Sequence, residues 1–186
     1  AAAAAAGLIL AAAFVPPYLY YRRGAMRDAA WDAYVASQSA ASQGRFDQAV
    51  QSAKEAADRH PAAEAADFAD LFAGDLLYRQ GKYKEAAAAY QRALDRGASK
   101  TAGPVALADL VQAREAGGDC AGAIEAAGRF IETQPDHFMS PVVHACVARC
   151  QEALGRKEDA KATLEKLSQL YPDTYWAGWA KARIKP

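Results

Sequence analysis

Apolar positions along this chain recur at the three- and four-residue spacing that places side chains on one face of an α-helix. Tyr90, Ala93 and Leu94 fall on one such face, and Leu164 and Leu167 fall on another. The residues between them are mostly polar and are expected to face water. This pattern predicts a series of amphipathic helices, each burying one side against its neighbours.

The helical pattern repeats at a fixed interval. Gly44, Gly81, Gly118 and Gly155 are each 37 residues apart. Five residues after each glycine comes an alanine, and seventeen residues after it comes a helix-ending position. These positions are Ala49, Ala86, Ala123 and Ala160, and then Pro61, Ala98, Pro135 and Pro172. Four copies of one unit indicate a helical solenoid, an architecture that usually offers a surface to partners and has no pocket for chemistry.

Each unit is expected to hold two antiparallel helices joined by a tight turn at the glycine, because glycine accepts positive φ. The small alanine lets the two helices approach closely where they cross. We expect units at residues 28–63, 64–100, 101–137 and 138–172, and a cap at 173–186. The predicted helix pairs are Asp28–Gln43 with Phe46–Arg59, Phe68–Gln80 with Lys84–Arg96, Pro104–Ala116 with Cys120–Gln134, and Pro141–Leu154 with Lys157–Tyr171, followed by Thr174–Lys185.

The composition agrees with an all-α fold, since alanine dominates and is the strongest helix former. Lys plus Arg number 22 and Asp plus Glu number 22, so the net charge is zero. A nucleic-acid-binding surface usually brings a basic excess. No nucleic-acid partner is therefore expected.

Residues 1–21 carry no charged side chain and, as a helix, would be about 31 Å long, close to the thickness of a bilayer core. The tyrosines at 18–21 followed by Arg22 and Arg23 resemble an interfacial belt and a polar stop. We expect a transmembrane helix at 1–21, a juxtamembrane linker at 22–27 and the repeat domain at 28–186. The alternative is the apolar region of a signal peptide. The arginines favour a cytoplasmic domain, although charges before residue 1 could reverse that count.

The segments Gly-Arg-Phe-Asp-Gln-Ala at 44–49 and Gly-Lys-Tyr-Lys-Glu-Ala-Ala-Ala-Ala-Tyr-Gln-Arg-Ala-Leu at 81–94 resemble the tetratricopeptide repeat family, as does the small Gly74. The resemblance covers about residues 28–172. It implies a right-handed α-solenoid in which the first helix of each unit lines a concave groove. The period of 37 is longer than the family's usual 34, which implies longer links between units.

By this resemblance, an aromatic-rich part of the groove would bind a protein partner. Its residues are Trp31, Tyr34, Phe68, Leu71, Tyr78 and Arg79. The alternative is that Trp31 and Tyr34 pack against Phe68 as interior. Some members hold a C-terminal carboxylate with lysine and asparagine. The corresponding positions here hold neither residue type, so an apolar peptide or helix fits the groove better. They are Tyr34, Gln38, Phe72, Val105 and Asp109.

The three cysteines, Cys120, Cys146 and Cys150, form no disulfide framework. His144, Cys146 and Cys150, with Cys120 or His137 nearby, suggest a zinc site. Their spacing matches no strong zinc pattern, and buried inert thiols are the simpler interpretation. A disulfide from Cys120 to Cys150 or Cys146 would require an oxidising compartment. A redox or metal-binding protein using these cysteines is thus an alternative function.

No catalytic constellation is apparent, so we expect neither an enzyme nor a cofactor. The order of an anchor, an arginine-flanked exit, Ala-Ala-Trp-Asp-Ala-Tyr at 29–34 and helical repeats is similar to the single-pass, repeat-bearing ancillary subunit of the bacterial Sec translocon and its relatives. This resemblance implies a periplasmic domain on the inner membrane. We expect a membrane-anchored interaction module that holds a peptide or a neighbouring subunit of a membrane complex. The alternative is an accessory subunit bound mainly through residues 1–21.

Overall fold

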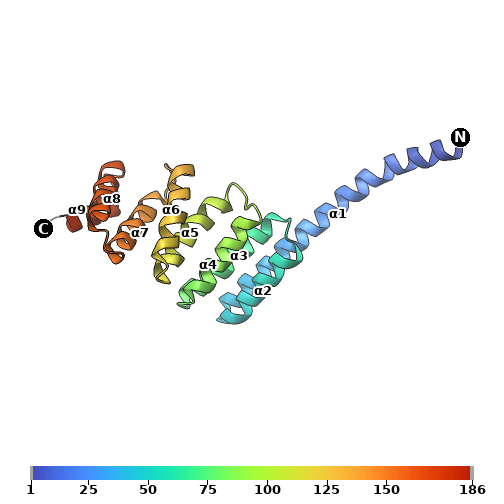
Figure 1. The fold of residues 1–186 in the computed structure, drawn as a ribbon. Coiled ribbons are helices and arrows are strands. Elements are labelled where there is room, and N and C mark those ends of the chain that lie inside the picture. Colours follow the sequence, from blue (N-terminus) through green and yellow to red (C-terminus); the bar gives the residue numbers. More distant parts are fainter. Residues whose placement is uncertain (1, 185–186) are drawn as a thin grey trace. The chain divides into compact units, whose positions relative to one another are not determined.

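The computed structural model describes the backbone of residues 2–184 and the side chains of residues 14–184. These residues form nine α-helices and no β-strand (Figure 1), which confirms the expected all-α helical solenoid. The helices are α1 (Ala2–Ser42), α2 (Phe46–Arg59), α3 (Glu64–Arg79), α4 (Tyr83–Asp95), α5 (Ala102–Ala116), α6 (Cys120–Thr133), α7 (Ser140–Ala153), α8 (Lys157–Leu170) and α9 (Tyr175–Ile184).

The predicted helix boundaries lie within two residues of the observed ones, apart from the starts of α1 and α3. Helix α3 begins at Glu64, four residues before the predicted start at Phe68. Ala65 and Ala66 are strong helix formers, and the acidic Glu64 and Asp67 suit the positive end of a helix. These residues extend α3 back into the link between units.

The turn between the two helices of each unit depends on its glycine, as predicted. Gly81 has φ of +75° and Gly118 has φ of +80°, a conformation that side chains with a Cβ rarely adopt. After α3, the Lys82 amide donates to the Leu77 carbonyl at 2.9 Å, which is the bond pattern of a glycine C-cap. The same conformation recurs at Gly44 and Gly155.

The alanines that follow these glycines are buried where helices meet. Their exposed fractions are 0% for Ala49, 0% for Ala86, 1% for Ala123 and 2% for Ala160. A larger side chain at any of these sites would push the two helices apart. The prediction of a small residue at each crossing is therefore confirmed.

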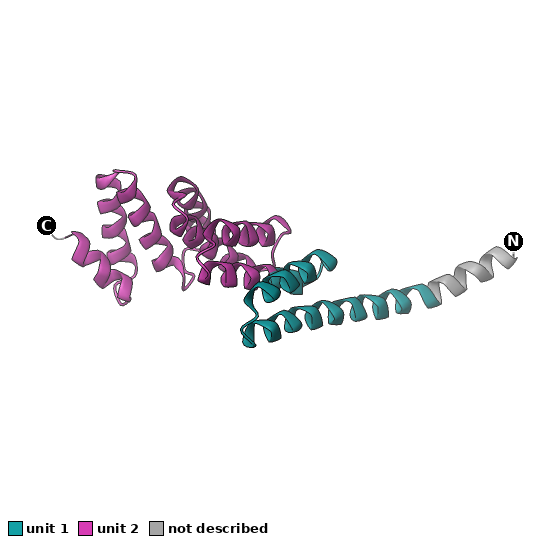
Figure 2. Ribbon diagram, turned by 90° about the horizontal axis from the view of Figure 1, so that it is seen from below, with its two compact units in different colours: residues 1–69 teal, residues 70–186 magenta. Residues whose placement is uncertain are grey.

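The chain divides into two compact units, residues 1–69 and residues 70–186 (Figure 2). In unit 1, α1 packs against α2. In unit 2, each helix from α4 to α9 packs against the next. In addition, α7 contacts both α5 and α9. Successive helix pairs therefore stack in chain order within unit 2. The repeat domain expected at 28–186 is shared between the two units.

Helix α1 is continuous, so the segment at 22–27, expected as a linker, is helical. It consists of arginine, alanine and methionine, which are good helix formers, around a single Gly24. The helix also contains Pro16 and Pro17. Among the residues whose side chains are described, Ala30 is the first buried one, so the part of α1 between residues 14 and 29 is mostly exposed.

The transmembrane helix expected at residues 1–21 is not supported. No helix in the described part of the chain is long and apolar enough to cross a membrane. The span is rich in alanine, and its longest run of strongly apolar residues is Leu8-Ile9-Leu10. Ala1 of this span lies outside the described residues, as do the side chains of residues 1–13.

Candidate binding groove

The first helix of each repeat carries the residues predicted to line the groove. In unit 2 these are the end of α3, then α5 and α7, followed by α9. Asp75, Gln112 and Arg149 hold equivalent positions on α3, α5 and α7, because 37 residues separate each from the next. Stacking of equivalent helices places such side chains in one row.

A pocket of about 320 Å³ opens at the α3 end of this row. Its lining combines aromatic and aliphatic side chains with two carboxylates, a guanidinium and an amide. The lining residues are Phe72, Asp75, Leu76, Tyr78, Arg79, Tyr90, Asp109 and Gln112. This volume is at the lower end of the range for ligand pockets and suits a single side chain.

Tyr90 of α4 connects the interior of the fold to this pocket. Its ring is buried, with 2% exposed, and its hydroxyl donates a hydrogen bond to Asp75 Oδ1 at 2.8 Å. The ring lies against Gly74 of α3, where an added Cβ would be 2.8 Å from ring atoms Cδ1 and Cζ. Burial and the Asp75 carboxylate raise the pKa of Tyr90, so this hydroxyl remains a donor.

Asp109 of α5 faces the same pocket. Its Oδ1 accepts a hydrogen bond from Gln112 Nε2 at 2.9 Å. Burial, together with the neighbouring Asp75 carboxylate, raises the pKa of Asp109 to about 7. Burial also raises the pKa of Asp75, while the Tyr90 hydrogen bond and the Arg79 charge oppose that shift. Among the described residues, the hydrogen-bond donors to these two carboxylates are thus the neutral Tyr90 hydroxyl and Gln112 amide.

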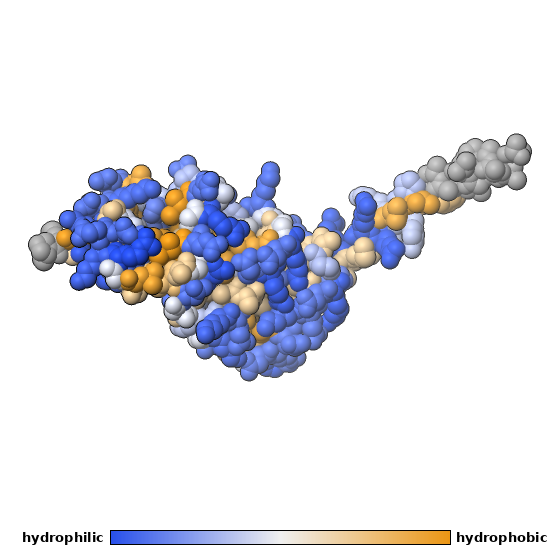
Figure 3. All heavy atoms as spheres, viewed as in Figure 1, coloured by the Kyte–Doolittle hydropathy of each residue, from blue (hydrophilic) through white to orange (hydrophobic). Residues whose placement is uncertain are grey.

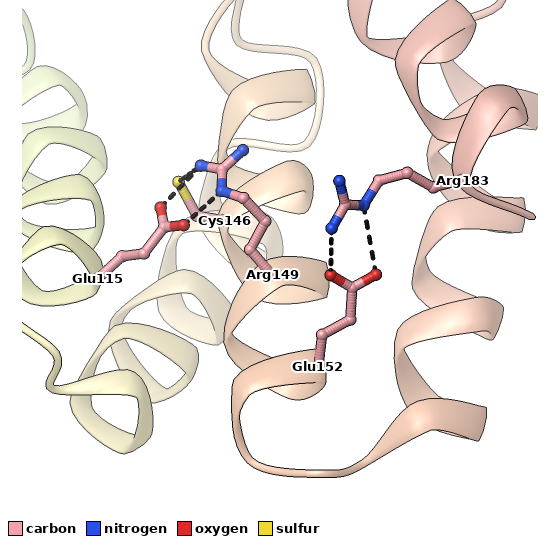
Figure 4. A network of polar contacts seen from close by, with 5 residues as sticks. All are labelled: Glu115, Cys146, Arg149, Glu152 and Arg183. Carbon is pink, nitrogen blue, oxygen red and sulfur yellow. Dashed lines mark hydrogen bonds and ion pairs between the residues drawn. The ribbon is translucent and has the colours of Figure 1, made fainter.

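The acidic groups farther along α5 and α7 are paired with arginines. Arg149 Nη2 donates to Glu115 Oε2 at 2.7 Å, and its Nε donates to the other carboxylate oxygen. Arg183 of α9 donates to Glu152 Oε2 at 2.6 Å. Figure 4 shows both pairs side by side, with each guanidinium turned toward its carboxylate. These two acidic residues therefore already have their counter-charge within the chain.

The same arginines cover the aromatic residues of α9. The guanidinium carbon of Arg149 lies 5.7 Å from the ring centre of Trp176 and 5.6 Å from that of Trp179. Arg183 lies 5.0 Å from the Trp179 ring. Both tryptophans pack on the buried cluster formed by Ala145, Ala148, Leu164, Leu167 and Ala180. This end of the stack is closed by its own side chains, as expected of a capping helix.

A buried acid on α3 was not foreseen from the sequence. Asp70 has 0% exposure, and both Arg92 and Arg96 of α4 donate hydrogen bonds to its carboxylate. The two arginines are four residues apart and so lie on one helical face. This spacing is the feature of the sequence from which a shared acidic partner could have been predicted. The pair has a structural role, because the Asp70 carboxylate is inaccessible.

Three of the predicted groove residues lie in unit 2. Tyr78 and Arg79 line the pocket, and the Tyr78 ring also packs edge-on against Tyr83 at 5.1 Å between ring centres. Leu71 is 8% exposed and belongs to the interior instead of an open surface. Partner binding by these residues stays a prediction.

The other three predicted residues form an aromatic cluster in unit 1. Trp31 lies 5.8 Å from Tyr34 and 5.6 Å from Phe68 between ring centres, and Tyr34 lies 6.4 Å from Phe68. All three side chains are half-buried. Such a cluster is compatible with interior packing and with partner binding, the two interpretations left open by the sequence. Trp31 also lines a cleft of about 510 Å³ with Met26 and Pro61.

All three cysteines are free thiols, and the sulfur of Cys146 accepts a hydrogen bond from Arg149 Nη2 at 3.3 Å. Burial raises the pKa of Cys146, and burial together with a hydrogen bond to Cys120 raises that of Cys150. Thiols that stay protonated are poor nucleophiles and poor metal ligands. Within the described residues, no three metal-binding side chains come together. The Cys120–Cys150 disulfide stays a prediction, and the redox or metal-binding alternative has no support.

The molecular face in Figure 3 is mostly hydrophilic, with patches of apolar side chains visible among the polar ones. Two segments of the chain match sequence models of the tetratricopeptide repeat, residues 71–96 and residues 147–174. In these two segments the chain is similar to tetratricopeptide repeats. The first segment includes Tyr78, Arg79 and Tyr90 of the pocket.

Solved tetratricopeptide repeat structures share the fold. A tetratricopeptide repeat protein from Parabacteroides merdae is 19% identical, with a TM-score of 0.69 over 85% of this chain and 59% of its own. MamA from Desulfovibrio magneticus RS-1, from residue 41 to its end, is 16% identical, with a TM-score of 0.61 over 78% of this chain and 77% of its own. At these identities the likeness concerns the fold alone. The chain thus spans less than two thirds of the Parabacteroides protein.

No curated protein sequence matches the chain. The resemblance to the ancillary subunit of the Sec translocon is not supported. The matching sequence models and the Parabacteroides structure are described as tetratricopeptide repeats, and none of them is described as a translocon subunit. Repeats of this kind generally act as protein-protein interaction modules, and the pocket between α3 and α5 is where this chain offers an unfilled part of its groove.

Proposed function

We propose that this protein is an interaction module that holds a peptide segment or a neighbouring subunit in the groove of unit 2. The observation that carries the proposal is the pocket lined by α3, α4 and α5, which exposes aromatic surface and two carboxylates beside Arg79. Enclosed aromatic surface is the usual anchor of a protein interface. Farther along the row, Glu115 and Glu152 are paired with Arg149 and Arg183, whereas the acids of the pocket are not in ion pairs among the described residues.

Site-specific photocrosslinking tests this proposal in the native organism. A photoreactive residue replaces Arg79, at the rim of the pocket, or Lys84, on the outer helix α4. Both side chains are exposed cations, and only five residues separate them. A discrete adduct from position 79 and none from position 84 is expected. Equal adducts from both positions, or adducts from position 84 alone, would show that the groove is not the binding surface.

The aromatic cluster of unit 1 offers a second contact, as expected from the sequence. Trp31→Ala combined with Phe68→Ala distinguishes its two interpretations. If the cluster binds a partner, recovery of the crosslinked adduct falls while the unfolding midpoint changes little. If the cluster is interior, the free energy of unfolding falls by the amount typical of truncating half-buried aromatic side chains, about 2–4 kcal/mol, and the midpoint falls with it.

A second candidate function is that of an accessory subunit bound mainly through α1. It is favoured by exposed apolar side chains on that helix, including Phe14 (69% exposed), Tyr18 (61%) and Met26 (48%). A contiguous exposed apolar surface commonly marks an interaction site. Replacing Phe14 and Tyr18 by serine would abolish partner recovery in this case, whereas binding through the groove of unit 2 would survive.

The periplasmic placement on an inner membrane stays a proposal of its own, separate from the interaction module. It derives from the order of segments in the sequence, with a cytoplasmic domain as the alternative. Fractionation of cells, followed by protease treatment of spheroplasts, tests it. Degradation in intact spheroplasts is expected for a periplasmic domain, and protection would place the domain in the cytoplasm.

A further inference from the structure

The two carboxylates of the pocket differ from the other acidic groups on the inner helices of unit 2. Glu115 is bonded to Arg149, and Glu152 is bonded to Arg183. Among the described residues, no lysine, arginine or histidine forms an ion pair with Asp75 or Asp109. Their hydrogen-bond donors are the Tyr90 hydroxyl and the Gln112 amide, which are neutral.

Neither acid of the pocket therefore has an ion-pair partner among the described residues, and Arg79 is the cation nearest to them in the lining. Asp109 is half-buried and Asp75 is exposed at the mouth of the pocket. The pKa of Asp109, about 7, reflects its partial burial together with the Asp75 carboxylate. Arg79 acts on Asp75 through its charge, but it lies on the exposed rim and forms no ion pair with either acid. A cation placed between the carboxylates would favour the ionised form of both acids.

The walls of the pocket suit the rest of a long basic side chain. Phe72 and Leu76 of α3 are apolar, and Tyr78 offers the face or edge of an aromatic ring. The aliphatic stem of lysine or arginine packs well on such surfaces while its charged end reaches a polar site. Aromatic rings also attract cations directly. The volume of about 320 Å³ admits one side chain but not a folded element.

We propose that this pocket receives a single arginine or lysine side chain of a partner peptide, with its cationic group between Asp75 and Asp109. The inference rests on the proposed function, and it specifies the chemistry of the bound segment. The peptide lies along the groove of unit 2, and the basic residue fixes its register. Arginine is the better fit of the two, because its planar guanidinium can donate to both carboxylates at once.

Selection from a displayed library of random peptides tests this inference with the full 186-residue chain. Wild-type protein and the Asp75→Asn, Asp109→Asn variant are used in parallel. A second variant, Glu125→Gln with Glu158→Gln, removes the same charge from exposed positions on the outer helices α6 and α8. Circular dichroism confirms that each variant is folded. Selected peptides are synthesised and their affinities are measured by fluorescence anisotropy.

Wild-type protein and the Glu125, Glu158 variant are expected to select peptides with a basic residue at one fixed position. Replacing that residue by glutamine in the peptide should weaken binding about tenfold, because its charged hydrogen bonds to the two half-enclosed carboxylates are lost. The same substitution should have little effect with the Asp75, Asp109 variant. Photocrosslinking from position 79 locates the selected peptides in the groove.

The possible outcomes separate this inference from the proposed function. Peptides that crosslink from position 79 but lack a fixed basic residue overturn the inference and leave the interaction module intact. The inference is also overturned if replacing the basic residue of a peptide weakens binding to the Asp75, Asp109 variant as much as it weakens binding to the wild-type protein. If no selected peptide crosslinks from position 79, or none is selected, both the inference and the groove as a peptide site are wrong.

Discussion

The close packing of Tyr90 on Gly74 predicts that this glycine tolerates no side chain. Gly74 is inside α3, where alanine would ordinarily stabilise the helix by about 0.5–1 kcal/mol relative to glycine. At this site the new Cβ would lie 2.8 Å from two atoms of the Tyr90 ring and closer still to Cε1. The ring is 2% exposed, so it has little space into which it can move. Overpacking of this kind typically costs about 1–3 kcal/mol.

Gly128 provides a matched control, since it also lies inside a helix, α6. A Cβ at Gly128 meets no atom within 4 Å, so Gly128→Ala should show the gain in helix propensity alone. The difference between the two variants isolates the clash, and we expect Gly74→Ala to be less stable than Gly128→Ala by about 1–3 kcal/mol. For a chain of this size each kcal/mol corresponds to about 2–4 °C in the unfolding midpoint.

Thermal unfolding followed by circular dichroism measures this difference. The double variant Gly74→Ala, Tyr90→Leu has no ring for the new Cβ to meet. Its loss of unfolding free energy should therefore be smaller, by at least about 1 kcal/mol, than the sum of the losses measured for the two single variants. The reasoning fails if Gly74→Ala is stabilised as much as Gly128→Ala. It also fails if the two substitutions at 74 and 90 are additive, because the clash would then contribute nothing.

Three further substitutions test other parts of the structure. Arg149→Met leaves the Glu115 carboxylate without its partner and should lower the free energy of unfolding by about 1–3 kcal/mol in urea titration, with Glu115→Gln restoring part of it. Gly118→Ala places a Cβ at φ of +80° and should cost about 1–2 kcal/mol by the same measurement. The pKa of Asp109 is raised, so this carboxyl stays protonated to higher pH in the native state than in the unfolded chain. The native state is therefore favoured by proton binding at low pH, and this stabilisation is lost as the pH rises from about 4 to about 7. Asp109→Asn should thus be more stable than wild type by about 1–3 kcal/mol at pH 8, and the advantage should vanish near pH 4.

The sequence predicts the repeat and its turns because these features are local and periodic. A glycine that needs positive φ and an alanine at a helix crossing are each set within one 37-residue unit, so a single recognised unit predicts the others. Gly81 and Gly118 confirm the turns, and Ala86 and Ala123 confirm the crossings. For Gly74 the family resemblance indicates only a small residue, and the structure adds the reason, which is the Tyr90 ring packed against it.

The pocket could not be predicted in the same way, because it depends on an offset between units. Asp75 is equivalent to Gln112 by the repeat, whereas Asp109 lies one helical turn before Gln112 on α5. Only the stacking of α5 beside the end of α3 brings the second carboxylate next to Asp75. Leu71 shows the converse error, since helical position alone placed it on the open surface although it is buried.

A ligand that binds at Asp75 and Asp109 should stabilise the helices around the pocket more than the rest of the molecule. In a helical stack, stability is approximately a sum of contributions from each unit and its neighbours. A bound ligand adds stability according to its concentration relative to its dissociation constant, and only where it contacts the fold. An arginine-containing peptide selected by the groove should therefore slow hydrogen exchange of backbone amides in α4 and α5. Exchange in α8 and α9 should change much less, because their junction is closed by Glu152, Arg183 and the tryptophans of α9. Uniform protection of all helices would contradict this argument, since it would require the stack to respond as one cooperative body.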